Sequence, residues 1–288
     1  MRPALFSLLS AALVLGGCGA KAQQIGGQLR TGDRPQVVSL SPSTSEIISS
    51  TYDSATLIGR TSSDDFPPSL SKVPVVASVK PDFERIRSIK PTLVVYDADL
   101  YNADDIKKIE GMGVESYAFK AHTVDGFEKE LYVLSNKLGS ETNVSGYVAR
   151  IDNERRSASA DSITPSPKVV VMLSGGAGSY VAGTGSFLAE IVKIAGGTLV
   201  GPDADKFAPM SSEALISAAP DVIVLSTSKA SGAKDVAALQ ADPRLRTTPA
   251  MKAGRIIPFD GSVLTRRGNR VDSLIRDLHH ELARSVQK

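Results

Sequence analysis

The chain has 288 residues, a formal net charge of +2 and 42% hydrophobic residues. This length allows one large or two medium-sized domains, and the balanced charge argues against a nucleic-acid partner, which usually requires a clustered basic face. The only cysteine is Cys18, so an intramolecular disulfide and a cysteine metal cluster are excluded. We expect no cofactor and no metal site.

The first 18 residues predict a signal peptide. Arg2 precedes the apolar run 4–14, which is too short to span a bilayer but suits the core of a signal sequence. Small residues before Cys18 resemble a bacterial lipobox, which implies that Cys18 is lipidated and becomes the mature N-terminus. An ordinary secretory signal with an incidental cysteine is the alternative. Residues 19–34 are rich in Gly, Gln and Lys and predict a flexible tether.

Residues 35–139 alternate between short apolar runs and helical stretches, which predicts a first lobe with a mostly parallel sheet and helices on both faces. The predicted strands are residues 37–40, 56–59, 74–76, 93–96 and 114–119, and the predicted helices are residues 45–50, 84–89 and 104–110.

A long helical pattern follows. Phe127, Leu131 and Leu134 share one face of a helix that ends at Gly139. Residues 140–162 then predict a linker helix of roughly 20 residues, about 30 Å long. Its apolar residues recur at i, i+3, i+4 and i+7, and they are Val144, Tyr147, Val148 and Ile151.

Residues 163–288 return to the alternating pattern and predict a second lobe. Its predicted strands are residues 169–173, 222–225 and 255–258, and its predicted helices are residues 187–195, 212–218 and 271–285. The predicted fold class is α/β, with two Rossmann-like lobes joined by a single long helix.

A short internal repeat supports two similar lobes. Residues 84–95 align without a gap with residues 213–224, so that Glu84 pairs with Glu213 and Pro91 with Pro220. Each copy predicts a helix that ends before a proline and a buried strand after it. Because the pattern occurs only twice, it favours two related lobes over a solenoid.

Several motifs together resemble the cobalamin, heme and ferric-siderophore periplasmic binding proteins of ABC importers. The resemblance covers nearly all of residues 35–282 and rests on the order and spacing of its motifs. They are Val-Val-Ser-Leu-Ser-Pro-Ser-Thr-Ser-Glu at 37–46, Asp-Asp-Phe-Pro-Pro at 64–68, Lys-Pro-Thr-Leu-Val at 90–94, Gly-Thr-Gly-Ser-Phe-Leu at 183–188, Ala-Gly-Gly at 195–197 and Thr-Arg-Arg-Gly-Asn-Arg at 265–270.

The resemblance implies a substrate-binding lipoprotein of an ABC importer, held in the cell envelope by its lipid, on the periplasmic side or the outer face of the cytoplasmic membrane. Its implied partners are the permease and ATPase complex and a small-molecule cargo, and we expect a monomer. By position, Glu84 and Glu213 would dock onto arginines of the permease. The alternative is that each glutamate only stabilises the first turn of its helix, by roughly 0.3–1 kcal/mol.

In open α/β sheets, ligands bind beyond the carboxyl ends of the strands. Rings there can stack on a planar ligand, and cations such as Arg267 can meet a carboxylate or a phosphate. The alternatives are core packing for each ring and a solvated loop for each cation. The candidate ligand-binding residues are Ser43, Asp65, Phe66, Lys80, Tyr101, Tyr180, Phe207 and Arg266.

Catalysis has little support in the sequence. There is no Gly-x-Ser-x-Gly motif, and the glycine-rich run 176–183 misses both the dinucleotide and the P-loop patterns. His279 and His280 lie on the C-terminal amphipathic helix, where we expect a solvated face. We therefore predict no enzyme activity. A secreted α/β hydrolase and an adhesion or scaffold lipoprotein are the alternatives.

We order the cargo as corrinoid, ferric siderophore and heme. The loop at residues 65–68 favours the corrinoid, although the chain has no tryptophan, which corrinoid binders often use. Heme binders usually offer a Tyr or His to the iron. Tyr101, His122 and Tyr180 are available, but none lies in a recognisable motif.

Overall fold

The computed structural model describes residues 34–287 apart from residues 54, 79, 140–141, 174–178 and 229–230. These residues form one compact unit. The predicted signal peptide, Cys18 and all of the predicted tether except Arg34 lie outside the described residues.

The first lobe is built on a five-stranded parallel sheet with the strand order β3-β2-β1-β4-β5. In β1 and β4, neighbouring valines point to opposite faces of the sheet. Val37 and Val95 join the core beneath α1 and α4, whereas Val38 and Val94 join the core beneath α2 and α3. The elements are β1 (Gln36–Ser39), α1 (Pro42–Thr51), β2 (Thr56–Thr61), η1 (Pro68–Lys72), β3 (Val75–Ala77), α2 (Phe83–Ser88), β4 (Leu93–Asp97), η2 (Ala98–Leu100), α3 (Ala103–Glu110) and β5 (Glu115–Phe119).

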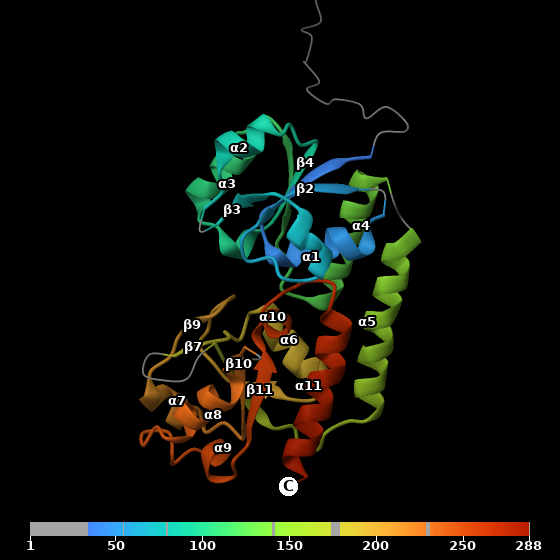
Figure 1. Cartoon of the computed structure of the whole chain (residues 1–288). Helices are drawn as coiled ribbons and strands as arrows, with labels where there is room; N and C mark the ends of the chain where they lie inside the picture. The colour runs from blue at the N-terminus through green and yellow to red at the C-terminus, as the bar shows by residue number, and fades with distance from the viewer. Residues whose placement is uncertain are drawn as a thin grey trace, which may run out of the picture. The chain divides into compact units, whose positions relative to one another are not determined.

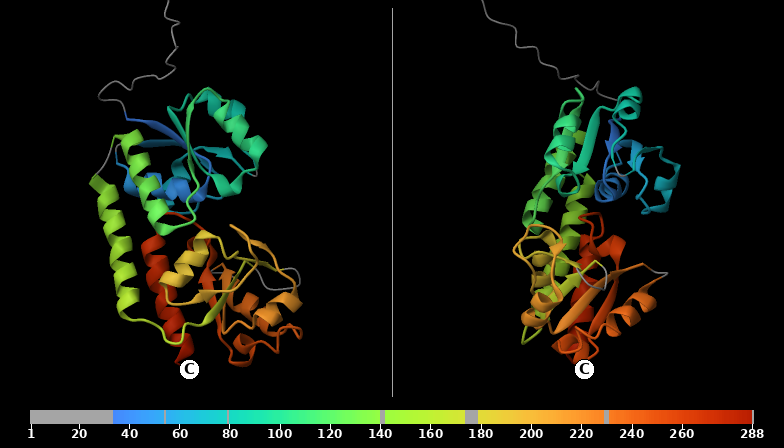
Figure 2. Two further views of the ribbon diagram at one scale, coloured as in Figure 1. Left: turned by 180° about the vertical axis from the view of Figure 1, so that it is seen from behind. Right: turned by 90° about the vertical axis from the view of Figure 1, so that its left-hand side faces the viewer.

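Two consecutive helices lead to the second lobe. Helix α4 (Val124–Leu138) ends at Gly139, whose φ of 67° is the left-handed conformation that glycine adopts readily. Helix α5 (Thr142–Ala160) lies within the predicted linker 140–162 and runs along the flank of the molecule beside α11 (Val271–Val286) (Figures 1 and 2). Its buried face holds Val144, Tyr147 and Ile151, as the periodicity predicted.

The second lobe has a mixed sheet with the order β11-β10-β6-β7-β9, and β8 pairs with β6. The pairs β6–β10 and β10–β11 are parallel, whereas β7 is antiparallel to both neighbours. The elements are β6 (Lys168–Met172), β7 (Tyr180–Val181), α6 (Phe187–Ile194), β8 (Thr198–Leu199), β9 (Ala208–Pro209), α7 (Ser212–Ala218), β10 (Val222–Thr227), α8 (Gly232–Gln240), α9 (Pro249–Lys252), β11 (Ile256–Asp260) and α10 (Gly261–Leu264). The predicted fold class of two α/β lobes joined by a long helix is confirmed.

The internal repeat is also a repeat of backbone conformation. Lys90 and Ala219 occupy equivalent positions, and both have a positive φ, of 51° and 48°. Each directly precedes the proline of its copy, Pro91 or Pro220. A left-handed conformation is uncommon for residues other than glycine, so the same costly turn leads into β4 and into β10.

An ion network joins the lobes through Glu46 on α1. This carboxylate is fully buried, with 0% of its side chain exposed. Arg270 binds it through Nη2 at 2.6 Å and Nε at 3.0 Å, and Nη1 of Arg266 lies 2.9 Å from Oε1. A Cβ on Gly268 would lie 2.5 Å from Oε2 of Glu46, so the chain needs glycine at this close approach. Such charge-assisted contacts are the stronger kind of hydrogen bond.

A second ion pair lies beside the first. Arg267 binds Asp97, at the end of β4, through both Nε and Nη2, and its Nη2 also lies 2.9 Å from Asp99. We name Arg266, Arg267 and Arg270 the arginine cluster. All three belong to the segment between α10 and α11 and bind carboxylates of the first lobe, so this segment fixes the floor of the space between the lobes.

Glu128 lies where α4 meets α5. Its side chain is 3.8 Å from Arg155, which binds Asp125 at 2.8 Å and Asp152 at 3.5 Å. Oε1 of Glu128 is buried and accepts no hydrogen bond from a described residue. Burial and, next, the Asp152 charge raise the pKa of Glu128 from 4.5 to about 7. The ionised form is therefore disfavoured in the folded chain.

We expect Glu46→Gln to lower the free energy of unfolding by about 3 kcal/mol, because it leaves two partly buried arginines without their shared carboxylate. Urea unfolding at neutral pH measures this loss. The matched control is Glu154→Gln, which removes a long, partly exposed pair with Arg276 at 3.9 Å and should cost less than about 0.5 kcal/mol. Equal stability of the two variants would show that the network does not hold the lobes.

We expect Glu128→Gln to stabilise the chain at neutral and alkaline pH but not at acid pH. The folded-state pKa lies above the unfolded value, so native Glu128 loses stability as pH rises between about 4.5 and about 7. The glutamine variant does not titrate, so it should gain about 1–3 kcal/mol at about pH 8 and nothing at about pH 4. Urea unfolding at both pH values measures this, with Glu281→Gln, at a partly exposed glutamate, as control. A gain of equal size at both pH values would contradict the assignment.

Candidate functional site

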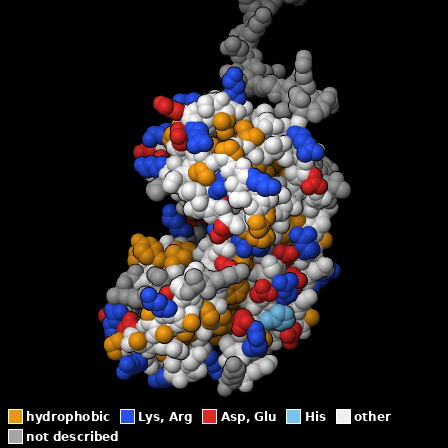
Figure 3. All heavy atoms as spheres, viewed as in Figure 1, with side chains coloured by type: hydrophobic (Ala, Val, Ile, Leu, Met, Phe, Trp, Pro, Cys, Tyr) orange, Lys and Arg blue, Asp and Glu red, His pale blue; other side chains and the backbone are white. Residues whose placement is uncertain are grey.

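The carboxyl ends of the parallel strands of both lobes face a shared space, and two cavities lie in it. They meet at Thr265 and Arg266, which line both. Figure 3 shows the surface hollowed between the lobes, with hydrophobic side chains gathered beside the hollow over β7 and β9. The position is the one expected for ligands of open α/β sheets.

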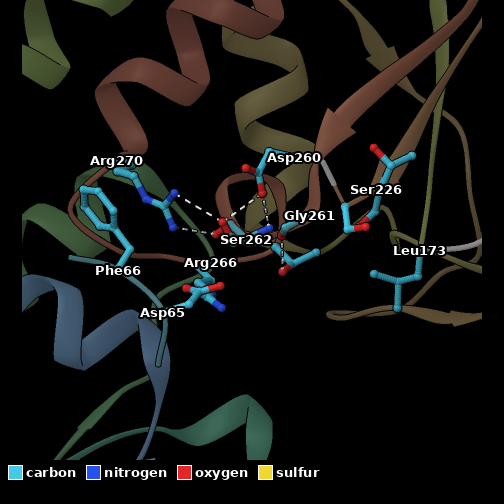
Figure 4. Close-up of a pocket in the computed structure, with 12 residues that line it drawn as sticks. Asp65, Phe66, Leu173, Ser226, Asp260, Gly261, Ser262, Arg266 and Arg270 are labelled. Carbon is cyan, nitrogen blue, oxygen red and sulfur yellow. Dashed lines mark hydrogen bonds and ion pairs between the residues drawn. The ribbon is translucent and has the colours of Figure 1, made fainter. Parts of the chain in front are cut away.

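The larger cavity has a volume of about 600 Å³, and we name it the hydroxyl compartment (Figure 4). Its size lies within the usual range for small-molecule sites. It combines hydroxyl groups with two arginines, one phenylalanine and two carboxylates. Its lining residues are Asp65, Phe66, Leu173, Ser226, Thr227, Ser228, Asp260, Gly261, Ser262, Thr265, Arg266 and Arg270.

Local structure holds these groups in place. Asp260 is the N-cap of α10, and its Oδ1 accepts hydrogen bonds from Ser262 N at 2.9 Å and Oγ at 2.8 Å. Arg270 donates to the carbonyl of Ser262 at 3.0 Å and lies 4.5 Å from the ring centre of Phe66. A guanidinium over a ring is an attractive cation–π pair. Phe66 of the first lobe is therefore fixed against the second lobe, as Figure 4 shows.

The smaller cavity has a volume of about 240 Å³, and we name it the phenylalanine compartment. Phe187, Leu188, Phe207 and Leu264 supply its apolar surface. Lys206 is exposed at its edge and forms no ion pair with another described residue. The other lining residues are Asp97, Asp99, Leu100, Ser186, Asp205, Thr265, Arg266 and Arg267.

The structure brings four of the eight candidate ligand-binding residues to these cavities. Asp65, Phe66 and Arg266 line the hydroxyl compartment, Phe207 lines the phenylalanine compartment, and Arg266 reaches both. The guanidinium of Arg266 already binds Glu46 and Asp65 and donates to the carbonyl of Ser63 at 3.2 Å.

The other four candidates lie outside the lining of both compartments. Ser43 is buried, with its Oγ 3.4 Å from Asp97. The hydroxyl of Tyr101 donates to the carbonyl of Leu40 at 2.5 Å. Its ring packs edge-on against Tyr96 at 6.0 Å. Lys80 and Tyr180 are exposed. A ligand-binding role for any of the eight stays a prediction.

Sequence reasoning did not single out Asp97, Phe187 or Arg270. Asp97 comes directly after the buried run 93–96, and this position at the end of a strand was the signal that could have identified it as a site residue. Phe187 and Arg270 entered only as members of the motifs at 183–188 and 265–270. The importance of Arg270 depends on a contact with Glu46 that no local pattern reveals.

Two of the histidines lie beside aspartates of the described residues. His122 lies 3.5 Å from Asp99. The prediction of a solvated face is wrong for His279, which is only 4% exposed. Its two ring nitrogens lie 3.1 Å from the carbonyl of Ala195 and 3.3 Å from Asp161. This histidine instead connects the end of α5 to α6 and α11. In the part of the chain that the structure describes, no three His, Cys, Asp or Glu residues are grouped to hold a metal.

The two glutamates of the repeat occupy matching places on the two lobes. Glu84 is in the first turn of α2 and Glu213 in the first turn of α7, and both are exposed. The N-cap of the first helix is Asp82 and that of the second is Ser211. The pKa of Glu213 is lowered because its carboxylate accepts hydrogen bonds from the backbone N–H of Glu213 and from the Ser211 hydroxyl. These contacts are the ones expected of a glutamate in a first helical turn, and the carboxylate stays exposed.

Comparison with known proteins places this geometry in a family. The family model described as "Periplasmic binding protein" matches residues 37–262. The curated relative YvrC of Bacillus subtilis, named an uncharacterized ABC transporter substrate-binding lipoprotein, is 23% identical, and the match covers 94% of each chain.

Solved structures share the fold. The periplasmic heme-binding protein RhuT from Roseiflexus sp. RS-1 is 27% identical with a TM-score of 0.75, and the match covers 88% of this chain and 100% of that one. The periplasmic vitamin B12 binding protein BtuF of Vibrio cholerae is 18% identical with a TM-score of 0.75, and the match covers 88% and 99%.

Among the helices that the structure describes, none combines the length and hydrophobicity needed to cross a bilayer. The family match confirms the resemblance seen in the sequence. It also argues against the secreted enzyme, because the matched family consists of binding proteins. The chain belongs to the periplasmic binding protein family.

Proposed function

We propose that this chain is the substrate-binding component of an ABC importer and that it captures a metal chelate between its lobes. The observation that carries the proposal is the pair of compartments joined at Arg266, where apolar rings lie next to hydroxyl and guanidinium groups. A few oriented polar groups beside apolar surface are typical of small-molecule sites. The name of the Bacillus subtilis relative supports the transport role.

The proposed cargo brings its own metal ligands. Among the described residues that line the two compartments there is no Tyr, His or Cys, and these are common protein ligands to heme iron. This supports the order corrinoid, ferric siderophore, heme. Heme, third in this order, stays a candidate because RhuT, a heme-binding protein, is 27% identical to this chain. Tyr101, His122 and Tyr180 are the available iron ligands if heme is the cargo.

We further propose that Cys18 carries a lipid that holds the chain in the cell envelope, on the periplasmic side or the outer face of the cytoplasmic membrane. The lipobox-like sequence before Cys18 supports this, as does the word lipoprotein in the name of the relative. In this proposal, residues 19–34 act as the tether and the chain works as a monomer.

Glu84 and Glu213 are the proposed contacts with the permease. They are exposed, they follow similar N-caps, and they lie one on each lobe (Figure 1). Two similar carboxylates on two similar lobes can engage a two-fold symmetric membrane partner.

We expect one of three probes to bind the mature protein with micromolar or tighter affinity, which corresponds to about −8 kcal/mol or better. The probes are cyanocobalamin, a ferric hydroxamate and hemin, and visible absorbance and calorimetry measure the titrations. Phe207→Ala should weaken the bound probe about three- to tenfold by removing ring contact, whereas Tyr132→Ala, on the exposed face of α4, should not. If none of the three bound, the proposed cargo class would be wrong.

We expect the double variant Glu84→Ala, Glu213→Ala to keep its cargo affinity and to lose stimulation of the permease ATPase, because both side chains lie outside the two compartments. Cargo titration and an ATPase assay in reconstituted membranes separate the two effects. The control is a double variant of glutamates that line neither compartment, Glu110→Ala with Glu281→Ala. A loss of cargo affinity in the first double variant would place these glutamates in the binding site instead.

A further inference from the structure

Arg266 binds two carboxylates, those of Glu46 and Asp65, and only the second is exposed to solvent. Glu46 has no exposed side-chain surface and is fixed by two further bonds from Arg270. Asp65 has 60% of its side chain exposed, and Arg266 is its one ion-pair partner among the described residues. The Arg266–Asp65 contact is 2.5 Å long and lies in the wall of the hydroxyl compartment (Figure 4).

The Arg266–Asp65 ion pair is the contact that an incoming anion can replace. An ion pair with a solvated partner changes an equilibrium by only about two- to fivefold, and Asp65 can move into water without leaving a buried charge behind. Arg266 cannot follow, because Glu46 holds it from inside. The other carboxylate that lines the compartment, Asp260, accepts hydrogen bonds from Ser262 at the N-terminus of α10. Arg266 is therefore the position where an incoming anion can take the place of a protein carboxylate.

We infer that Asp65 is an internal counter-ion that occupies the place of an anionic group of the cargo. On binding, a carboxylate or phosphate group of the cargo displaces Asp65 and takes over Arg266, with the hydroxyl groups of the compartment around it. The inference rests on the proposed function and narrows it, because the cargo must carry an exposed anionic oxygen group. Asp65 then sets specificity by competing with that group.

The test uses citrate as a small anionic probe, at constant ionic strength, on the mature protein. Asp65→Asn keeps the shape of the side chain and removes its charge, so citrate should bind about two- to fivefold more tightly. Arg266→Gln should weaken citrate binding at least about fivefold. The matched control is Asp125→Asn. Asp125 is 65% exposed, pairs with Arg155 at 2.8 Å and lines neither compartment, so this variant should bind citrate as the wild type does.

A pair of iron chelates extends the test to cargo-sized molecules. Ferric citrate carries free carboxylates and a ferric trihydroxamate carries none. Asp65→Asn should strengthen binding of the first and leave the second unchanged. Calorimetric titration measures all affinities, and circular dichroism with thermal unfolding checks that each variant is folded.

Two results would overturn the inference: citrate that binds Asp65→Asn no more tightly than wild type, or citrate that binds neither protein. Either result could accompany tight binding of a neutral chelate, in which case the proposed function would stand without the counter-ion. Conversely, citrate could respond to the variants as expected while no chelate, corrinoid or hemin binds. The anion site would then be supported and the proposed cargo class would be wrong.

Discussion

The burial of Glu46 is the constraint on which the rest of the site depends. A carboxylate without solvent contact is tolerated only when positive groups surround it, and here both come from the other lobe, as Arg266 and Arg270. Meeting this requirement brings the segment between α10 and α11 against α1 and requires glycine at position 268. It also places Arg266 where the two compartments meet. The need to neutralise the buried carboxylate of Glu46 thus helps to determine where the two compartments lie.

The lobes, their strands and the long helices were predictable because they depend on patterns of apolar residues that are local in the sequence. Buried runs such as residues 93–96 and 222–225 became the central strands β4 and β10. The two-residue strands β7, β8 and β9 were missed, because segments this short carry no periodicity. Helix α8 was also missed.

The site was less predictable. A residue's position after a strand does not show whether its side chain points into the cavity or into its own lobe. Phe66 and Tyr101 both follow strands of the first lobe. The ring of Phe66 lines a cavity, whereas the hydroxyl of Tyr101 is bound to Leu40 within the lobe. His279 shows the same limit on a helix, since an amphipathic pattern places a residue on a boundary only to within about one position. Contacts between residues far apart in sequence decide these cases.

The packing of α5 determines which lobe it moves with. Its Tyr147 donates to the carbonyl of Gly268 at 2.7 Å and accepts from Val271 N at 3.2 Å, and the helix runs along α11. In mechanical terms the middle of α5 is therefore held by the second lobe, although the helix still joins the two lobes. A pivot between the lobes is expected where α4 ends, at the left-handed Gly139. A pivot there lies beside the first lobe, so a small rotation would move the far rim of the space between the lobes much more than its floor.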